Sequence, residues 1–259
     1  MMTKMNRKYY KWIWLVLGIV LWEAVARLSD VSPLAFPSLV LVFSAMVESF
    51  QSGDLFVQIG NSLVLIGVGL LAAIVLSVFL SAIRLIHPLF DSLVETLISI
   101  FHPLPGIALL PVVILWIGIG SKAVIFIIIH SVLWPMTLNM SAGFQSLPVV
   151  YKKIAANYEL ALEQKIFRIY IPASFPYAIA GLKIGWARAW RAAISAEMIF
   201  GATGASGGVG WYLFNKRVFM DTPGLFAGLI VIVLIGILVE DLFFGKMEKN
   251  TIEKWGVAL

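Results

Sequence analysis

Residues 55–83 read LFVQIGNSLVLIGVGLLAAIVLSVFLSAI, and these 29 positions contain no Asp, Glu, Lys or Arg. A helix that crosses the hydrocarbon layer of a membrane needs about 20 consecutive apolar residues, so this stretch is long enough. The run is continuous rather than alternating, which favours a helix over a strand of a membrane barrel. The chain has three further charge-free runs, which are residues 96–121, 123–150 and 222–239.

The composition of the whole chain agrees with these runs. Of its 259 residues, 61% are hydrophobic and 13% are charged. An average soluble domain carries about 25% charged residues, so a soluble fold and a disordered chain are both excluded. Cysteine is absent, which excludes disulfides and cysteine-based zinc or redox sites.

Two further segments are apolar in outline but contain charged residues. Residues 12–26 contain Glu23, and residues 176–200 contain three basic residues and Glu197. With these segments, the sequence predicts an all-α integral membrane protein with six transmembrane helices. We expect the helices near residues 12–28, 58–84, 92–118, 122–145, 174–200 and 222–245.

The first apolar segment is also similar to a secretory signal peptide, with Ala24-Val25-Ala26 as a cleavage site. Glu23 and the later spans favour a retained helix instead. The basic residues give the orientation, because Lys and Arg concentrate on the cytoplasmic side. With both termini inside, twelve of the 19 Lys and Arg residues are cytoplasmic, four are outside and three lie in the fifth span. The net charge of +5 is thereby explained without nucleic acid.

The third span contains His102-Pro103-Leu104-Pro105 and then Pro111. Proline removes a backbone donor and clashes with the preceding turn, so we expect this helix to be kinked or to start near Pro103. Pro105 and Pro111 are therefore candidates for lining a pathway, and a kink that serves only packing is the alternative. Between the first two spans, Ser38 is expected to cap a short helix that runs to Phe50.

The longest soluble excursion is residues 148–172, on the cytoplasmic side by the charge distribution. Two short amphipathic helices fit it, over residues 150–162 and 163–171, with Pro172 ending the second. Such helices lie on a lipid surface or dock into a partner protein. The mixture of acidic and basic residues favours a protein partner.

This loop resembles the cytoplasmic signature of binding-protein-dependent ABC transporter permeases, which is E-A-A, three residues, G, nine residues, I-x-L-P. Ile169-Tyr170-Ile171-Pro172 matches the end of the signature. Lys153-Ile154-Ala155 stands in place of E-A-A, and Glu159 stands in place of the glycine. A shift of one residue aligns Ala155-Ala156 with the two alanines but breaks the spacing to the proline.

Other short motifs resemble this family in the same order, from about Trp12 to Trp255. The resemblance is closest to permeases of the nitrate/sulfonate/taurine group, and it places a type-1 transmembrane domain at residues 55–245. Residues 1–54 then hold the N-terminal tail, the first helix and an outer segment, and residues 246–259 form a cytoplasmic tail. The motifs are Leu21-Trp22-Glu23, Phe36-Pro37-Ser38, Ala108 to Pro111, Leu115 to Gly120, Ala189-Trp190, Ala196-Glu197-Met198, Gly207 to Trp211 and Leu238 to Asp241.

The resemblance implies a transport subunit of the cell membrane that is not itself an enzyme. This chain would form half of the path for a small anionic solute. Candidate solutes are a sulfonate, nitrate, a taurine-like compound or a carboxylate. The implied partners are two ABC ATPase subunits, which would hold ATP and Mg²⁺, a second permease copy or paralogue, an extracytoplasmic binding protein and membrane lipid. No cofactor is expected in this chain. The residues that the signature assigns to ATPase docking are Lys153, Ile154, Ala155, Ala156, Tyr158, Glu159, Leu160 and Pro172.

The charges of the fifth span allow two interpretations. Arg188 and Arg191 are three residues apart and share a helix face, with Trp190 beside them and Glu197 about two turns further on. The arginines either line the path of an anion or pair with Glu197 or with a carboxylate of another span, such as Glu23 or Glu95.

The glycine-rich stretch after the fifth span is the last candidate region. Gly207, Gly208 and Gly210 either form an outer gate or belong to a plain flexible loop. Gly204-Ala205-Ser206-Gly207 also matches the G-x-S-G of rhomboid-type serine proteases, but no histidine follows Ser206 to act as its base. A secondary transporter half is the other alternative, with Glu95 and Glu197 as possible coupling sites. The three histidines have spacings that match no helical ligand pair, so no metal site is predicted.

Overall fold

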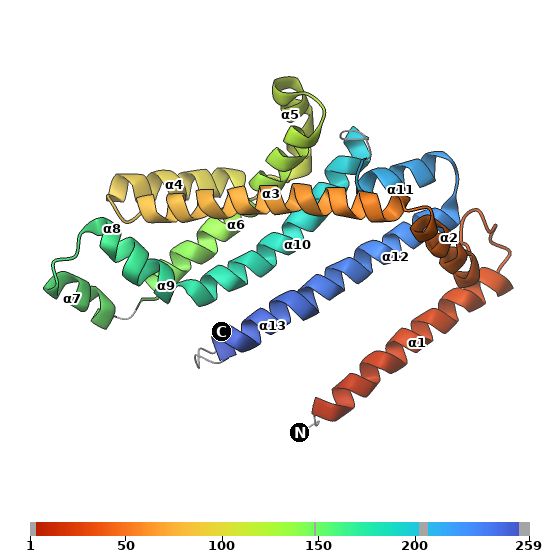
Figure 1. The fold of residues 1–259 in the computed structure, drawn as a ribbon, viewed down its shortest axis with the longest axis horizontal. Helices are drawn as coiled ribbons and strands as arrows, with labels where there is room; N and C mark the ends of the chain where they lie inside the picture. Colours follow the sequence, from red (N-terminus) through yellow and green to blue (C-terminus); the bar gives the residue numbers. More distant parts are fainter. Residues whose placement is uncertain (1–3, 148, 202–206, 254–259) are drawn as a thin grey trace.

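The computed structural model describes residues 4–147, 149–201 and 207–253, and every element within these ranges is a helix (Figure 1). Five helices are long, and their bounds lie close to five of the six predicted spans. They are α1 (Lys4–Leu28), α3 (Asp54–Ile83), α6 (Ser121–Gln145), α10 (Phe175–Phe200) and α12 (Thr222–Leu238).

Shorter helices connect and extend the long ones. They are α2 (Leu39–Gln51), α4 (Pro88–Phe101), the 3-10 helix η1 (Gly106–Leu109), α5 (Leu110–Ile117), α7 (Val149–Asn157), α8 (Leu162–Lys165), the π-helix η2 (Ile166–Tyr170), α9 (Ile171–Ala173), α11 (Val209–Val218), the π-helix η3 (Val239–Phe244), α13 (Gly245–Glu248) and the π-helix η4 (Lys249–Glu253).

The helix α6 lies at the centre of the core, packed between α3 and α10. Small residues on α3 allow the close approach: Gly69, Ala73 and Ser77 are all buried, as their four-residue spacing predicts. At Gly69 an added Cβ would lie 2.6 Å from the side chain of Ile128 on α6, so only glycine fits at this contact. The outer surfaces are apolar and exposed; on α1, for example, Trp14 is 69% exposed.

Three helical stretches of the described chain are long and apolar enough to cross a membrane: Asp54–Ile83, Ser121–Gln145 and Thr222–Thr251. A fourth results if α4 and the segment Gly106–Ile117 count as one broken span. The remaining two predicted spans are present as helices α1 and α10. All the elements fit an integral membrane protein, and the count of six spans stays a prediction.

The third predicted span is broken. The helix α4 ends at Phe101, and the next helical segment starts at Gly106 after a bend of 87°. The expected kink at Pro103 and Pro105 is confirmed, and it divides the predicted span over residues 92–118 into two helical segments. Two prolines within three residues remove two backbone donors and prevent the turn from continuing. Figure 1 shows α5 standing out from the bundle as a result.

The end of α1 is anchored by the two motifs that the family resemblance brought out. Trp22 Nε1 donates a hydrogen bond to Pro37 O at 3.0 Å, and the ring packs on Phe36 and Phe226. Glu23 accepts a hydrogen bond from Leu39 N at 2.8 Å. The prediction that Ser38 caps α2 with its side chain is therefore wrong, because the carboxylate of Glu23 takes that position.

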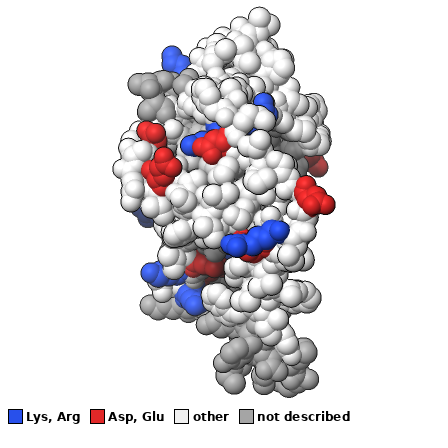
Figure 2. All heavy atoms as spheres, turned by 90° about the vertical axis from the view of Figure 1, so that its right-hand side faces the viewer, with Lys and Arg blue, Asp and Glu red and all other residues white. Residues whose placement is uncertain are grey.

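The molecule has two distinct ends. The helices α2 and α11 lie at one end, where α1 ends and α12 begins, and α7 and α8 lie at the opposite end (Figure 1). Figure 2 shows the end with α2 and α11, where acidic and basic side chains lie in small separate groups on an otherwise uncharged surface. No single-sign patch is seen on this face, as expected if the charges pair locally.

Candidate functional site

A cavity of about 440 Å³ lies where the chain breaks between α4 and η1. Its remaining walls come from α6 and α10, and we refer to it as the α6–α10 cavity. The broken backbone forms one side because it cannot pack as a regular helix against α6. The cavity is lined by His102, Pro103, Leu104, Pro105, Gly106, Ile107, His130, Ser131, Trp134, Arg188, Arg191, Ala192 and Ser195.

Two arginines of α10 give this cavity its charge. Arg188 and Arg191 both line it, and Arg191 Nε donates a hydrogen bond to Ala187 O of its own helix at 2.9 Å. Among the described residues, no Asp or Glu lines the cavity. Neither arginine takes part in an ion pair within the described part of the chain, so pairing with Glu197, Glu23 or Glu95 is not supported.

The other pathway candidates divide between the cavity and the core. Pro105 lines the cavity, but Pro111 lies on the exposed side of α5 and does not. Trp190 is buried outside the cavity, stacked on Trp186 with ring centroids 5.8 Å apart. The helical spacing correctly placed the two arginines on one face of α10. It could not show that this face lies at the break between α4 and η1.

Sequence reasoning missed two residues of this cavity, His130 and Trp134 of α6. They lie four positions apart on one helix, both are at least nine-tenths buried, and their rings make an edge contact with centroids 6.2 Å apart. The available signal was a histidine within a predicted span, since polar residues inside a membrane are expensive and usually functional. No group of three or more possible metal ligands occurs among the described residues.

Glu197 belongs to a different, fully buried network. Its carboxylate accepts hydrogen bonds from Ser62 Oγ of α3 at 2.8 and 2.9 Å and from Gly210 N of α11 at 2.9 Å. Ser62 Oγ in turn accepts a hydrogen bond from Val209 N at 2.9 Å. The carboxylate therefore joins α3, α10 and the start of α11.

The candidate gate glycines lie against this network. At Gly208 an added Cβ would lie 2.3 Å from Glu197 Oε1, and Gly207 has φ +62 and accepts a hydrogen bond from Asn61 Nδ2 at 2.7 Å. Gly210 is buried as well. Residues 207–210 are thus a packed segment rather than a plain loop, and their role as a gate stays a prediction. Ser206 and the rest of the G-x-S-G match before it, from Gly204, lie outside the described residues.

A polar cluster also closes the turn between α11 and α12. Lys216 Nζ donates a hydrogen bond to Asp221 Oδ2 at 2.6 Å, and Asp221 Oδ1 caps α12 by accepting from Gly224 N at 2.9 Å. Burial pushes the pKa of Asp221 upward, but the hydrogen bonds from Lys216 and Gly224 outweigh burial and hold this pKa below its ordinary value.

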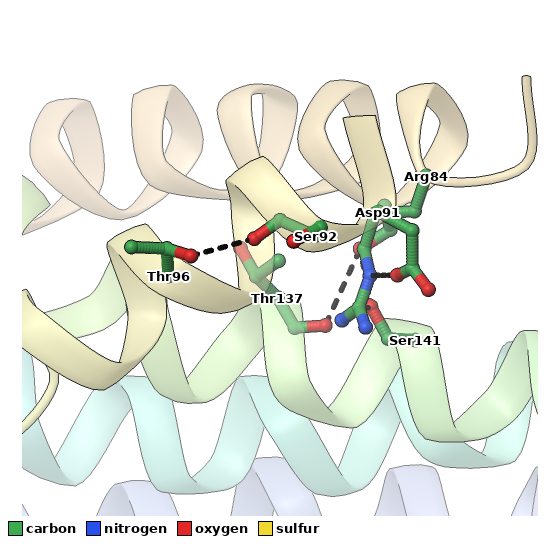
Figure 3. A network of polar contacts seen from close by, with 7 residues as sticks. Arg84, Asp91, Ser92, Thr96, Thr137 and Ser141 are labelled. Carbon is green, nitrogen blue, oxygen red and sulfur yellow. Dashed lines mark hydrogen bonds and ion pairs between the residues drawn. The ribbon is translucent and has the colours of Figure 1, made fainter. Parts of the chain in front are cut away.

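A second polar cluster ties α3 and α4 to α6. Figure 3 shows the Arg84 guanidinium between Asp91 of α4 and Ser141 of α6. Arg84 Nε lies 2.5 Å from Asp91 Oδ1, and Arg84 Nη1 donates to Ser141 Oγ at 3.0 Å. Arg84 therefore links the end of α3 to α4 and α6 through side-chain hydrogen bonds. Because both partners belong to packed helices, we assign it a structural role.

The predicted docking loop forms α7 to α9. The helix α7 contains Lys153, Ile154, Ala155 and Ala156; Ala155, the residue that matches the signature, is 4% exposed. Tyr158 and Glu159 are exposed and follow α7 directly, and Leu160 is half-buried. Leu160 N donates to Ala155 O at 3.2 Å, and Glu159 has φ 46. This is a Schellman ending with Glu159 in the left-handed position that glycine normally takes, so the turn is kept despite the substitution.

Pro172 does not end the second helix of the loop, contrary to expectation. It lies exposed within α9, which continues to Ala173 before α10 begins. The π-helical turn η2 directly precedes it. The wider π-helical turn changes the backbone hydrogen-bond pattern that a proline ring would otherwise disrupt. The chain therefore stays helical through Pro172.

The sequence of the chain is similar to those of known transport permease proteins. At 25% identity over 254 residues, the chain matches the taurine transport system permease protein TauC of Escherichia coli K12, covering 92% of this chain and 91% of that protein. At 25% identity over 256 residues, it matches the putative aliphatic sulfonates transport permease protein SsuC of Bacillus subtilis 168, covering 97% and 91%. The nitrate import permease protein NrtB of Synechocystis PCC 6803 is 27% identical over 192 residues, covering 74% and 68%.

The match to a family model is independent of any single relative. The model for binding-protein-dependent transport system inner membrane components matches residues 66–252. This region contains α6, α10, the cavity between them and the loop α7 to α9. Because it makes up well over half of the chain, the chain belongs to the family of binding-protein-dependent transport system inner membrane components.

Proposed function

We propose that this chain is the permease subunit of an ATP-driven ABC importer and forms half of the path for a small anionic solute. One observation carries the choice of solute: two arginines line the α6–α10 cavity, and no carboxylate of the described part of the chain does. The names of three relatives agree, since aliphatic sulfonates and nitrate are anions and taurine carries a sulfonate group. An anion that enters this cavity would meet compensating charge in a region where charge is otherwise expensive.

The proposal includes six spans with both termini in the cytoplasm and the loop α7 to α9 on the same side. The helices α1 and α12 run so that both chain ends point away from α2 and α11 (Figure 1), which supports this topology. The excess of Lys and Arg in the predicted cytoplasmic segments also supports it. Residues 55–245 then form the transmembrane domain, between an N-terminal region over 1–54 and a tail over 246–259.

The proposed partners are two ATPase subunits, a second permease copy or paralogue, and an external binding protein. The loop α7 to α9 is the proposed docking element because it exposes large apolar side chains at one end of the molecule: Tyr158 is 75% exposed, Phe167 70% and Val150 63%. Exposed apolar residues among charges fit a protein partner. ATP and Mg²⁺ would bind in the ATPase subunits, and this chain supplies the mechanical coupling.

Purification of the tagged chain from its native membranes tests the proposal. We expect an ATPase subunit with a phosphate-binding Gly-x-x-x-x-Gly-Lys-Ser/Thr motif to co-purify and to be identified by mass spectrometry. The variant Tyr158→Asp should lose this subunit, and Phe219→Asp should retain it, since Phe219 is 78% exposed in the turn between α11 and α12. Purification of the wild-type chain without any ATPase would contradict the proposal.

A further inference from the structure

Two buried side chains of the α6–α10 cavity have polar atoms that no described residue binds. His130 is 7% exposed, and neither of its ring nitrogens has a hydrogen-bond partner among the described residues. Trp134 is 9% exposed, and its Nε1 has none either. Buried polar atoms are nearly always hydrogen-bonded, so two such side chains lining one cavity indicate a ligand.

The positions of these side chains are fixed by their neighbours. Phe101 of α4 stacks on Trp134 with ring centroids 5.3 Å apart and an interplanar angle of 13°. His130 makes edge contacts with both rings, at 6.3 Å from Phe101 and 6.2 Å from Trp134. Donors that are held in place before a ligand arrives lose little entropy when it binds, so the cavity wall is preorganised.

The chemistry of the wall selects the class of ligand. The indole Nε1–H is a donor only, and a neutral imidazole has one N–H donor. Arg188 and Arg191 add planar guanidinium groups, which bind oxoanions through two parallel hydrogen bonds. Ser131 and Ser195 supply hydroxyl groups. A ligand that satisfies this set carries negative charge and several acceptor oxygens, and a volume of about 440 Å³ is within the usual range for small-molecule sites, about 300–1,000 Å³.

We propose that the α6–α10 cavity is an oxoanion-binding site inside the permease, in which Trp134 and His130 donate hydrogen bonds and Arg188 and Arg191 supply the charge. Nitrate and sulfonates share the required chemistry. This inference rests on the proposed function and extends it, because it assigns part of the solute selection to the membrane subunit in addition to the external binding protein.

Saturation-transfer NMR on the full-length chain in nanodiscs tests the site, with methanesulfonate as the probe and dimethyl sulfone as its neutral analogue. Wild-type protein should bind methanesulfonate saturably and should not bind dimethyl sulfone, and nitrate should compete with methanesulfonate while chloride at equal concentration should not. The variant Trp134→Phe keeps an aromatic ring against Phe101 and removes the indole N–H together with the five-membered ring that carries it. We expect it to bind about tenfold more weakly, as for one lost hydrogen bond to a charged group.

Trp190→Phe is the matched control. Trp190 is also a buried tryptophan whose Nε1 has no partner among the described residues, but it lies outside the cavity. Its substitution should leave methanesulfonate affinity unchanged. His130→Phe should weaken binding like Trp134→Phe, with size-exclusion profiles and melting temperatures of all variants confirming that each is folded.

Three results would overturn the site: no saturable binding to folded wild-type protein, equal binding by wild type and Trp134→Phe, or an equal loss in Trp190→Phe. Failure of this inference is distinguishable from failure of the proposed function. If the site is wrong, ATP-dependent uptake of nitrate or sulfonate still occurs and is insensitive to Trp134→Phe. If the proposed function is wrong, no such uptake occurs even in a chain that binds methanesulfonate.

Discussion

Glu197 is the most deeply buried charged residue of the described chain, and its carboxylate accepts hydrogen bonds from two neighbouring helices. Sequence reasoning placed it in a pathway or a charge network with Arg188 and Arg191. The structure separates the two roles: the arginines lie on the cavity, and Glu197 holds the segment 207–210 against α3. A buried carboxylate with satisfied partners positions the backbone rather than lining a path.

We predict that Glu197→Ala strongly destabilises the protein. It leaves the hydroxyl of Ser62 and the N–H of Gly210 without an acceptor, at about 1–3 kcal/mol each, so the expected loss is about 2–6 kcal/mol. Glu197→Gln retains one carbonyl oxygen and should lose less. Thermal unfolding of the purified variants measures this, with Glu95→Ala as the control because Glu95 is exposed on α4. A melting temperature of Glu197→Ala equal to that of the control would disprove the role.

Asp221 makes stability depend on pH at the turn before α12. Its pKa is lowered in the folded protein, because the hydrogen bonds from Lys216 and Gly224 outweigh the effect of burial. A lowered pKa contributes stability above the ordinary value, about pH 4 for Asp, and this stability is lost as the pH falls through the folded pKa. We therefore expect the melting temperature difference between wild type and Asp221→Asn to be largest at neutral pH and to shrink below about pH 4. A constant difference down to pH 3 would contradict this assignment.

Among the helices, α7 ends in a turn that forms although one of its residues, Glu159, has an unfavourable backbone conformation. Glu159 occupies the left-handed position of a Schellman ending, with φ 46. Residues other than glycine are strained there by about 1–2 kcal/mol. Glu159 thus raises the local free energy and adds a charge to the surface, and the Schellman turn still forms around it.

Glu159→Gly should therefore stabilise the α7 ending, by about 0.5–1 kcal/mol after the entropy of glycine in the unfolded loop is included. Hydrogen exchange of the α7 amides should slow accordingly. Glu163→Gly is the control: Glu163 lies in α8, and glycine within a helix costs about 1 kcal/mol, so exchange there should accelerate. Faster exchange of the α7 amides in Glu159→Gly would show that the positive φ is not strained.

The elements that sequence predicted best are those fixed by local chemistry. Continuous apolar runs predicted α3, α6 and α12, and the prolines at 103 and 105 predicted the break after α4. Two local predictions failed, one because of a contact with another helix and one because of the local helix geometry. Glu23 comes from a distant helix to cap α2 in place of Ser38, and a π-helical turn carries the backbone through Pro172. Neither the Glu23 contact nor the π-helical turn has a signal in the neighbouring sequence.

The candidate site was predicted in part for the same reason. Helical spacing placed Arg188 and Arg191 together, and they do share the cavity. Their neighbours His130 and Trp134 lie on α6, and only the packing of α6 against α10 brings the two pairs together. Periodicity within one helix shows which residues share a face, but it does not show which other helix that face meets.

At the scale of the whole molecule, the proposed topology is open to a direct test. The chain contains no cysteine, so single-cysteine variants report one position each. Tyr158→Cys at the end of α7 should react with a membrane-impermeant maleimide only when the cytoplasmic side is accessible. Phe219→Cys, at the opposite end, should react in intact cells. Both side chains are exposed in this chain, so the variants are expressed without the ATPase subunits, which would otherwise cover position 158. Labelling of Tyr158→Cys from outside would refute the topology and the docking loop with it.

The most direct measurement is anion uptake into proteoliposomes that contain this chain with its co-purified ATPase subunits. We predict that labelled nitrate or sulfonate accumulates only when ATP reaches the ATPase side and the binding protein is present on the other side. Arg191→Gln should reduce uptake without loss of ATPase binding, since Arg191 lines the cavity and does not belong to the loop α7 to α9. Accumulation driven by an ion gradient in the absence of ATP, or uptake of neutral solutes alone, would contradict the account.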